Sequence, residues 1–432
     1  MNVRFYKITD KKMIRLLFSL CWIVYFSTYI GRLNYSASLA EIIRSEGFSK
    51  GQAGIIGTAF FFAYGAGQFV SGFLGDRLAP KRMVFTGMTI SGICNLCMVF
   101  SKTPALMAAV WCVNGLFQAF IWSPMIRLMY EYYTEEQRMK ACVSLNSSVP
   151  IGTMAAYGIT ALVIWLSGWR TIFLLAGVLL LLVAFVWLNG MNRVERFAVA
   201  HGEEIEGKPL GDSKDVRQDG TANRQITLNW RSLLIDSGFF LLMIALFVQG
   251  ALKDGVTTWV PDYISETYGL SAILAITSTM IIPVFNLVGV YLASYANMHW
   301  FRNEIRTAGA FFVLSAAAIL ILRIFSGQSM ALSFLMLAVA TTAMMAVNTM
   351  LIAVLPSYFG VAGKASSVSG LLNSSVYAGG ALSTYGIGAL SASAGWNMTI
   401  FIWFLMAAAA AGLCFLVVRR WMIYRKEILQ VF

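Results

Sequence analysis

The sequence predicts an all-α integral membrane protein with twelve transmembrane helices in two six-helix bundles. Apolar residues make up 58% of the 432 residues, and charged residues make up only 12%. The apolar residues fall into twelve long runs, and one polar stretch divides these runs into two sets of six. An ordinary soluble domain carries about a quarter charged residues. The composition therefore excludes a soluble enzyme, a disulfide scaffold and a disordered protein.

Each apolar run is long enough to cross a bilayer. A crossing takes about 20 mostly apolar residues, so twelve take roughly 240, which is nearly the whole apolar content. The first six spans are expected near residues 14–43, 51–76, 83–101, 104–132, 139–166 and 171–190. The second six are expected near residues 232–262, 271–297, 307–325, 329–357, 365–392 and 395–419.

The spans divide the chain into two bundles and three polar parts. The bundles cover residues 14–190 and 231–419, with an N-terminal segment at 1–13 and a tail at 420–432. Residues 191–230 contain few large apolar side chains and no periodicity. Such a segment cannot bury enough surface to offset its ordering entropy, so we predict a cytoplasmic linker there.

Lysine and arginine are distributed unevenly between the two sides of the predicted membrane. Of the 32 basic residues, 25 lie on the side that holds both ends of the chain. The opposite loops hold Arg44, Lys50, Lys102, Arg170 and Arg323. Cytoplasmic loops are enriched in basic residues, so both termini are expected in the cytoplasm, and the cell membrane is the expected location. The net charge of +12 is thus a topology signal, and no nucleic-acid partner is expected.

The two halves share a sequence repeat. Residues 145–149 read LNSSV, and the same five letters recur at 372–376, in the fifth and eleventh expected spans. Equivalent spans of two related halves are typical of carriers that place a binding site between the halves. The repeat therefore indicates a duplicated half around a central pathway.

Two cations fall in the middle of expected spans. Arg32 lies in the first span and Lys253 in the seventh, and each costs roughly 2.5–3.5 kcal/mol at mid-bilayer on insertion scales. Such residues normally face a water-filled cavity. The structural alternative is an ion pair with a carboxylate. For Lys253 the neighbour Asp254 keeps that alternative open, although adjacent α-helical residues point about 100° apart.

Further polar residues are expected at the same depth, and they form the candidate binding residues with the two cations. They are Tyr25, Tyr29, Tyr64, Gln68, Gln118, Asn146, Asn373 and Tyr377. A polar residue on a single membrane helix often only links helices. Here they accompany two cations and no acidic cluster, which favours a site for an organic anion. The cysteines lie in apolar runs and the two histidines in polar connections, so no metal or other cofactor is expected.

Residues 72–82 read GFLGDRLAPKR, which resembles the loop signature of the major facilitator superfamily. In that family the acid and the bases of this loop latch the cytoplasmic ends of helices. The resemblance therefore implies the major facilitator fold and gating roles for Asp76, Arg77 and Arg82.

Within that superfamily the chain resembles the organophosphate:phosphate antiporters, which include glycerol-3-phosphate and hexose-phosphate transporters. Tyr25, Tyr29 and Arg32 match the first-span tyrosines and the phosphate-binding arginine of that family. Residues 252–255 and 259–261 match the stretch that holds its second binding arginine, which is Lys253 here. Matching positions in other spans are Tyr64, Gln118, Asn146 and Tyr377.

Several positions depart from the glycerol-phosphate carriers. Gln68 stands in place of a lysine, Val149 in place of a histidine and Gly250 in place of a tyrosine. The site is therefore less positive, and a phosphate ester of different bulk, a carboxylate or a sulfonate fits it too. Gln118 stands where proton-coupled relatives have a glutamate. That difference favours exchange over proton symport, with Asp254 as the candidate coupling residue.

The resemblance implies a secondary active transporter that works by alternating access. The expected activity is exchange of a small organic phosphate for inorganic phosphate by a monomer in the lipid bilayer. The alternatives are a proton-coupled carboxylate or sulfonate symporter and a sugar-phosphate sensor that does not transport. No nucleophile–base set or metal-ligand cluster appears within the spans, so we expect no enzyme.

Overall fold

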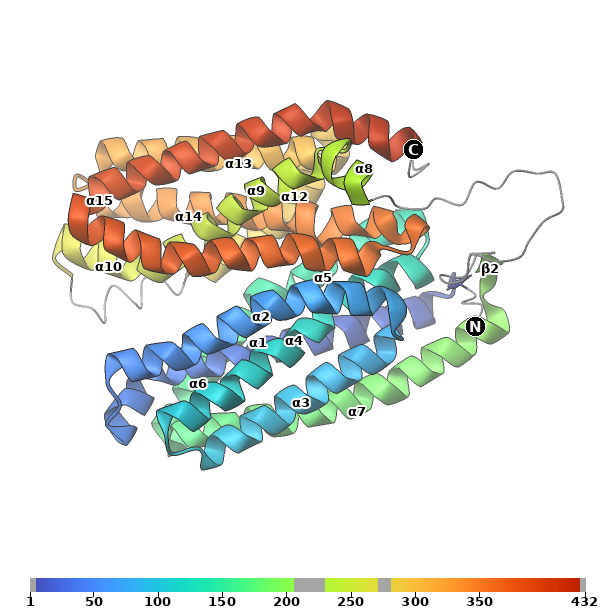
Figure 1. The fold of residues 1–432 in the computed structure, drawn as a ribbon, viewed down its shortest axis with the longest axis horizontal. Helices are drawn as coiled ribbons and strands as arrows, with labels where there is room; N and C mark the ends of the chain where they lie inside the picture. The colour runs from blue at the N-terminus through green and yellow to red at the C-terminus, as the bar shows by residue number, and fades with distance from the viewer. Residues whose placement is uncertain (1–4, 206–229, 271–280, 428–432) are drawn as a thin grey trace.

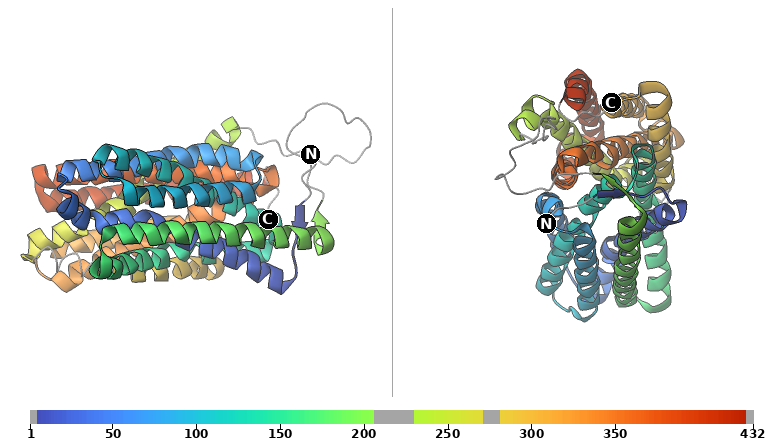
Figure 2. Two further views of the ribbon diagram at one scale, coloured as in Figure 1. Left: turned by 90° about the horizontal axis from the view of Figure 1, so that it is seen from below. Right: turned by 90° about the vertical axis from the view of Figure 1, so that its right-hand side faces the viewer.

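The computed structural model describes residues 5–205, 230–270 and 281–427. Its long helices form two lobes that lie side by side, with the first half of the chain in one lobe and the second half in the other (Figure 1). Figure 2 shows the same separation when the molecule is viewed along its helices. This arrangement agrees with the two predicted bundles.

The N-lobe consists of helices from the first half of the chain. They are α1 (Lys11–Glu46), α2 (Lys50–Arg77), α3 (Pro80–Phe100), α4 (Pro104–Tyr132), α5 (Glu135–Asn146), α6 (Ser148–Ser167) and α7 (Trp169–His201). Local sequence explains several ends. The Asp10 carboxylate caps α1, Ser49 and Gln52 form a capping box on α2, and Gly47 ends α1 at φ 70°.

The C-lobe contains shorter and more irregular helices. They are α8 (Trp230–Ile235), α9 (Phe239–Gly250), η1 (Ala251–Gly255), α10 (Val256–Tyr268), α12 (Ile282–Ala296), η2 (Asn297–Phe301), α13 (Glu304–Phe325), α14 (Met330–Asn348), η3 (Thr349–Val354), η4 (Leu355–Ala362) and α15 (Ala365–Glu427). The long α15 changes direction at Gly395, where φ is 75° and ψ is 171°. This kink falls at the first residue of the last expected span, 395–419, just after the preceding expected span, 365–392.

Ten helices in the described ranges are long and apolar enough to cross a membrane. The chain is thus a multi-pass membrane protein with an all-helical bundle fold. Part of the expected eighth span, residues 271–280, lies outside the described residues, and the count of twelve stays a prediction.

The two ends of the described chain lie at the same end of the molecule, which we call the termini end (Figure 1). There α7 continues beyond its expected end at residue 190 as far as His201. A short strand β1 (Phe5–Lys7) pairs antiparallel with β2 (Glu203–Ile205), which the sequence did not predict. Most of the expected linker, residues 206–229, lies outside the described residues. The cytoplasmic position of this end stays a prediction.

Three helix breaks lie near the middle of the molecule. Pro150 lacks the N–H that would bond to the Asn146 carbonyl, and the helix breaks there into α5 and α6. Pro356 likewise cannot donate a hydrogen bond to the Ile352 carbonyl, and the π-helical η3 changes to the 3-10 helix η4 there. The third break is the π-helical turn η1. Turns of this kind often occur at functional sites.

The lobes meet most closely along α2 and α15. A Cβ on Gly370 would lie 2.4 Å from the Gln68 carbonyl oxygen and 2.6 Å from the Gly72 Cα. Glycine is therefore required at this crossing for the backbones to approach. The contact lies in the half of α2 that leads to the termini end, so the lobes are closed together there.

Candidate functional site

A cavity lies between the lobes at the three helix breaks. Six of the predicted binding residues line it: Tyr25, Tyr29, Asn146, Lys253, Asn373 and Tyr377. Its volume is about 20 Å³. A single water molecule needs about 10–15 Å³ on this measure, so the conformation has space for about one water.

Arg32 on α1 is buried behind this cavity. Its guanidinium carbon lies 3.8 Å from the centre of the Tyr29 ring and 5.4 Å from the centre of the Tyr64 ring. Only 8% of the residue is exposed, and it has no carboxylate partner within the described chain. Aromatic faces therefore hold this cation by cation–π attraction. The structural alternative of an ion pair finds no support at Arg32.

Lys253 on η1 has a carboxylate partner. Its Nζ lies 3.0 Å from Oδ1 of Asp254, whose side chain is 38% exposed. The expectation that adjacent residues point apart holds for an α-helix, but η1 is a wider π-helical turn and the lysine stem is flexible. Asp254 therefore reaches its neighbour, contrary to the α-helical estimate. Tyr29 and Lys253 both line the central cavity, and Tyr29 also packs against the Arg32 guanidinium, so the two cations flank the same tyrosine.

Aromatic and amide side chains join the lobes around the cavity. Tyr64 and Tyr377 meet edge to face with ring centres 4.5 Å apart. Nδ2 of Asn146 donates to Oγ1 of Thr349 at 2.9 Å, and Nδ2 of Asn373 donates to Oε1 of Gln68 at 3.3 Å. These polar groups therefore bond across the interface when the lobes are in contact.

Gln118 is not among the cavity-lining residues. Its Nε2 donates to Oγ of Ser91 at 2.9 Å, and Ser91 in turn donates to Asn114 at 2.5 Å. This network continues to Asn95 and the Gly31 carbonyl inside the N-lobe. The structure therefore places Gln118 in a link between N-lobe helices, while Arg32, Tyr64 and Gln68 contact residues that line the cavity.

Asp76 joins the lobes at the termini end. Its carboxylate accepts hydrogen bonds from the backbone N–H groups of Ser366 and Ser367, at 3.0 and 3.2 Å, and from the Ser367 hydroxyl. These donors form the first turn of α15, where the helix dipole favours an anion. Arg77 and Arg82, also predicted to act in gating, are exposed, and no ion pair of either is found in the described part of the chain.

Some residues near these contacts were not predicted. Trp122, Asn348, Ile352 and Val376 line the central cavity as well. Arg127 donates to the carbonyls of Gly75 and Leu78, at 2.7 and 3.1 Å, and so holds the end of α2 next to Asp76. A buried amide in an apolar run was a usable signal for Asn348. Trp122, Ile352 and Val376 are apolar and resemble any packing residue.

No group of three or more metal-ligating side chains is placed to hold a metal ion in the described ranges. The six cysteines are free thiols.

Comparison with known proteins gives transport proteins and sensors as relatives. The chain is 26% identical over 292 residues to the "Probable hexose phosphate transport protein" of Chlamydia pneumoniae, covering 65% of this chain and 64% of the relative. It is 25% identical to the "Membrane sensor protein UhpC" of Salmonella typhimurium, covering 69% of this chain and 67% of the relative. The matched region spans less than two thirds of the length of the hexose phosphate relatives. The predicted resemblance to the organophosphate:phosphate antiporters is confirmed at this modest identity.

The fold also matches a solved structure. A crystal structure of FucP, a Major Facilitator Superfamily transporter in the outward conformation, superposes with a TM-score of 0.70 at 14% identity. The match covers 94% of this chain and 99% of FucP. These relatives and the helices described above confirm the expected multi-pass location in the cell membrane.

The family model described as "Major Facilitator Superfamily" matches residues 21–384, most of the chain. The protein therefore belongs to the Major Facilitator Superfamily, as residues 72–82 predicted.

Proposed function

We propose that the protein is a secondary active transporter of a small organic phosphate, which it exchanges for inorganic phosphate by alternating access. The observation that carries the proposal is a pair of cations at the central cavity, one from each lobe. Arg32 is buried against the Tyr29 ring, and Lys253 lines the cavity together with Tyr29. Arg32 has no carboxylate partner in the described residues. Two cations on opposite lobes suit a dianion that binds between them.

The charges also suggest why exchange is favoured. In the empty site Arg32 and Lys253 repel each other, and Asp254 neutralises only one of them. A bound dianion neutralises both and permits the lobes to close around it. A ligand shifts a conformational equilibrium only by its differential affinity for the two states. A carrier that changes conformation mainly when loaded performs exchange.

The small cavity fits a contracted resting conformation of this carrier. A volume of about 20 Å³ has no space for a phosphate ester, so Tyr25, Tyr29 and Tyr377 must move when substrate enters. Gln68 and Val149 carry less positive charge than the matching residues of the glycerol-phosphate carriers, and Lys253 offers a point charge in place of an arginine fork. These differences suit a less highly charged or bulkier phosphate ester. The hexose phosphate relatives point to the same substrate class.

The decisive experiment is counterflow in proteoliposomes. Vesicles loaded with unlabelled phosphate should take up labelled phosphate at equal pH on both sides. Uptake that strictly requires a proton gradient, with no counterflow, contradicts exchange and supports the symport alternative. In that case Asp254 is the coupling residue, because its side chain is partly exposed and pairs with Lys253.

The sensor alternative has one specific observation in its favour. The chain is as similar to a membrane sensor as to a transport protein. A sensor binds its sugar phosphate without net flux. Saturable binding in detergent together with no uptake and no counterflow identifies that function, whereas counterflow excludes it.

A further inference from the structure

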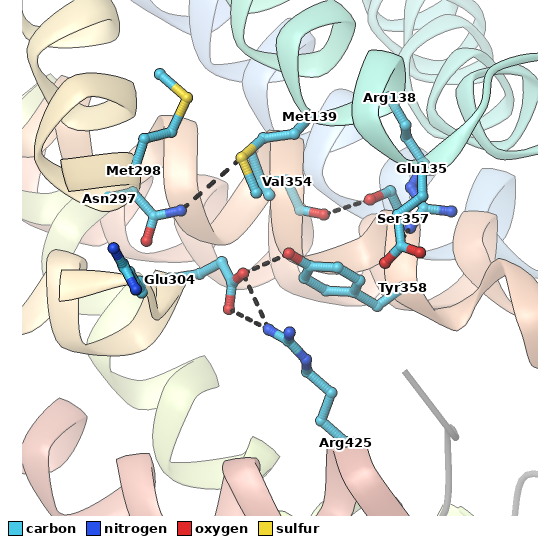
Figure 3. A pocket seen from close by; sticks show the side chains of 11 residues that line it. Glu135, Arg138, Met139, Asn297, Met298, Glu304, Val354, Ser357, Tyr358 and Arg425 are labelled. Carbon is cyan, nitrogen blue, oxygen red and sulfur yellow. Dashed lines mark hydrogen bonds and ion pairs between the residues drawn. The ribbon is translucent and has the colours of Figure 1, made fainter. Parts of the chain in front are cut away.

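A second cavity, larger than the central one, lies at the termini end. Its volume is about 240 Å³, and α5 of the N-lobe and five elements of the C-lobe line it. Figure 3 shows charged and polar side chains entering it from several helices. Those with formal charge are Glu135, Arg138, Arg302, Glu304 and Arg425. The cavity thus lies between the lobes and contains more cations than anions.

One carboxylate of this cavity, that of Glu304, already has partners within the protein. Glu304 is only 2% exposed, and Nη1 of Arg425 lies 3.3 and 3.4 Å from its two oxygens. The Tyr358 hydroxyl donates to Oε1 of Glu304 as well (Figure 3). Arg425 therefore neutralises Glu304 within the C-lobe, which leaves Arg138 and Arg302 as the cations whose charge is least compensated.

Arg138 is a buried guanidinium with few partners. The residue is 5% exposed, and its closest carboxylate, on Glu135, is largely exposed and 3.9 Å away. No side-chain hydrogen bond from Arg138 is found in the part of the chain that the structure describes. Its guanidinium carbon instead lies 5.7 Å from the centre of the Tyr358 ring. A guanidinium has five N–H donors, and a buried one without acceptors is costly.

Arg302 reaches the cavity from a strained backbone. Its φ is 50°, and it is the one non-glycine residue with positive φ in the described ranges. A left-handed conformation costs an L-residue roughly 1–2 kcal/mol, and glycine avoids that cost. Strain of this kind is concentrated at functional sites. At this turn a long cation occupies a position where glycine is easier to accommodate.

The potential around Arg138 is positive beyond the cavity wall. Lys7 lies with its Nζ 4.6 Å from the centre of the Tyr130 ring, and Arg138 approaches the same ring at 5.4 Å. Burial, and then the Arg138 guanidinium, lower the pKa of Lys7 to about 8. The two nearby carboxylates, Glu131 and Glu135, only partly offset this effect.

We propose that this cavity is a second anion site, which binds a small oxyanion of the phosphate class between Arg138 of the N-lobe and Arg302 of the C-lobe. Charge-assisted hydrogen bonds from guanidinium groups suit such an ion. Both lobes contribute, so the complete site exists only while the lobes meet at the termini end. The bound ion therefore stabilises that closed conformation. The proposal does not depend on the function proposed above.

Hydrogen exchange with inorganic phosphate as the probe tests this site locally. Phosphate should slow amide exchange in the full-length protein in residues 135–142 and 297–304, one segment from each lobe. In Arg138→Gln the phosphate concentration for half protection should rise about tenfold or more, because a hydrogen bond to a charged group is lost. Lys140→Gln is the matched control. Lys140 also lies on α5, but it is exposed and pairs with Glu136, so this variant should behave as wild type.

Two further variants make the result decisive. Arg302→Gly removes a cation while relieving the backbone, so it should fold well and still weaken protection about tenfold. Arg32→Ala should abolish protection in residues 251–255, at the central site, and leave residues 135–142 and 297–304 protected. The second site is contradicted if phosphate protects Arg138→Gln and Arg302→Gly as well as it protects wild type. It is also contradicted if Arg32→Ala loses the phosphate protection at the second cavity. If phosphate binds the second site but not the central site, wild-type protein lacks phosphate protection only in residues 251–255.

Discussion

Arg32 is a buried cation and Lys253 a half-buried one, and their surroundings differ. Arg32 faces the rings of Tyr29 and Tyr64, whereas Lys253 pairs with Asp254. An arginine offers two parallel N–H groups to a phosphate, and a lysine acts as a point charge. We therefore expect Arg32 to provide most of the geometric recognition and Lys253 to provide mainly charge.

Arg32→Ala should weaken phosphate binding by about tenfold to a hundredfold, because hydrogen bonds to charged groups contribute about 1.5–3 kcal/mol. The measurement is the rise in melting temperature with inorganic phosphate. Arg44→Ala is the matched control, since Arg44 lies on the same helix but is exposed and pairs with Glu41. A full phosphate-dependent rise in Arg32→Ala means that the site is misplaced.

Asp254→Asn separates exchange from proton symport. The substitution removes the partner of Lys253 and leaves the site more positive, so phosphate should bind more tightly and counterflow should persist at equal pH. Labelled-phosphate uptake in proteoliposomes measures this. Complete loss of coupled uptake with intact folding instead assigns the proton-carrying role to Asp254.

At the scale of elements, the sequence predicted most of the helices but not their breaks. Apolar run length located the spans, and Gly395 was found at the expected boundary. Hydropathy has no signal for the π-helical turn that lets Asp254 reach Lys253. It also could not place Arg138 beside Tyr358, because these residues come from different lobes and only packing brings them together.

The crossing of α2 and α15 gives a prediction for Gly370→Ala. The added Cβ would lie 2.4 Å from the Gln68 carbonyl oxygen, so the helices must separate at a cost of about 1–3 kcal/mol. The closed state at the termini end should therefore be less populated, and the amides of Ser366 and Ser367 should exchange faster.

Gly158→Ala, on α6 and away from this crossing, is the control, because a Cβ at Gly158 meets nothing within 4 Å. Its hydrogen exchange should match that of wild type. If the Ser366 and Ser367 amides exchange equally fast in Gly370→Ala and wild type, the crossing does not stabilise the closed state at the termini end.

At the scale of the whole molecule, contacts at the termini end hold the lobes together. Asp76 bonds to the start of α15, and the glycine crossing lies next to it. Of the three gating residues predicted from residues 72–82, only Asp76 bonds across the lobes in the described structure. The sequence pattern located the loop. It could not show that Arg127, rather than Arg77 or Arg82, holds the loop by hydrogen bonds.

Asp76→Asn should shift the carrier away from the conformation closed at the termini end. The amide keeps one acceptor but loses the charge that interacts with the α15 helix dipole, an interaction of about 0.3–1 kcal/mol, or up to about 2 kcal/mol when partly buried. Faster exchange of the Ser366 and Ser367 amides measures the shift. Exchange as slow as in wild type means that Asp76 does not hold the lobes closed.

Counterflow of labelled phosphate tests the central claim most directly, because it needs a site that loads an anion and reorients only when loaded. Wild-type proteoliposomes containing unlabelled phosphate should accumulate the label transiently at equal pH, and Arg32→Ala and Lys253→Ala should each abolish that accumulation while Arg44→Ala retains it. No accumulation by the wild-type protein, or undiminished accumulation by either central variant, contradicts the account.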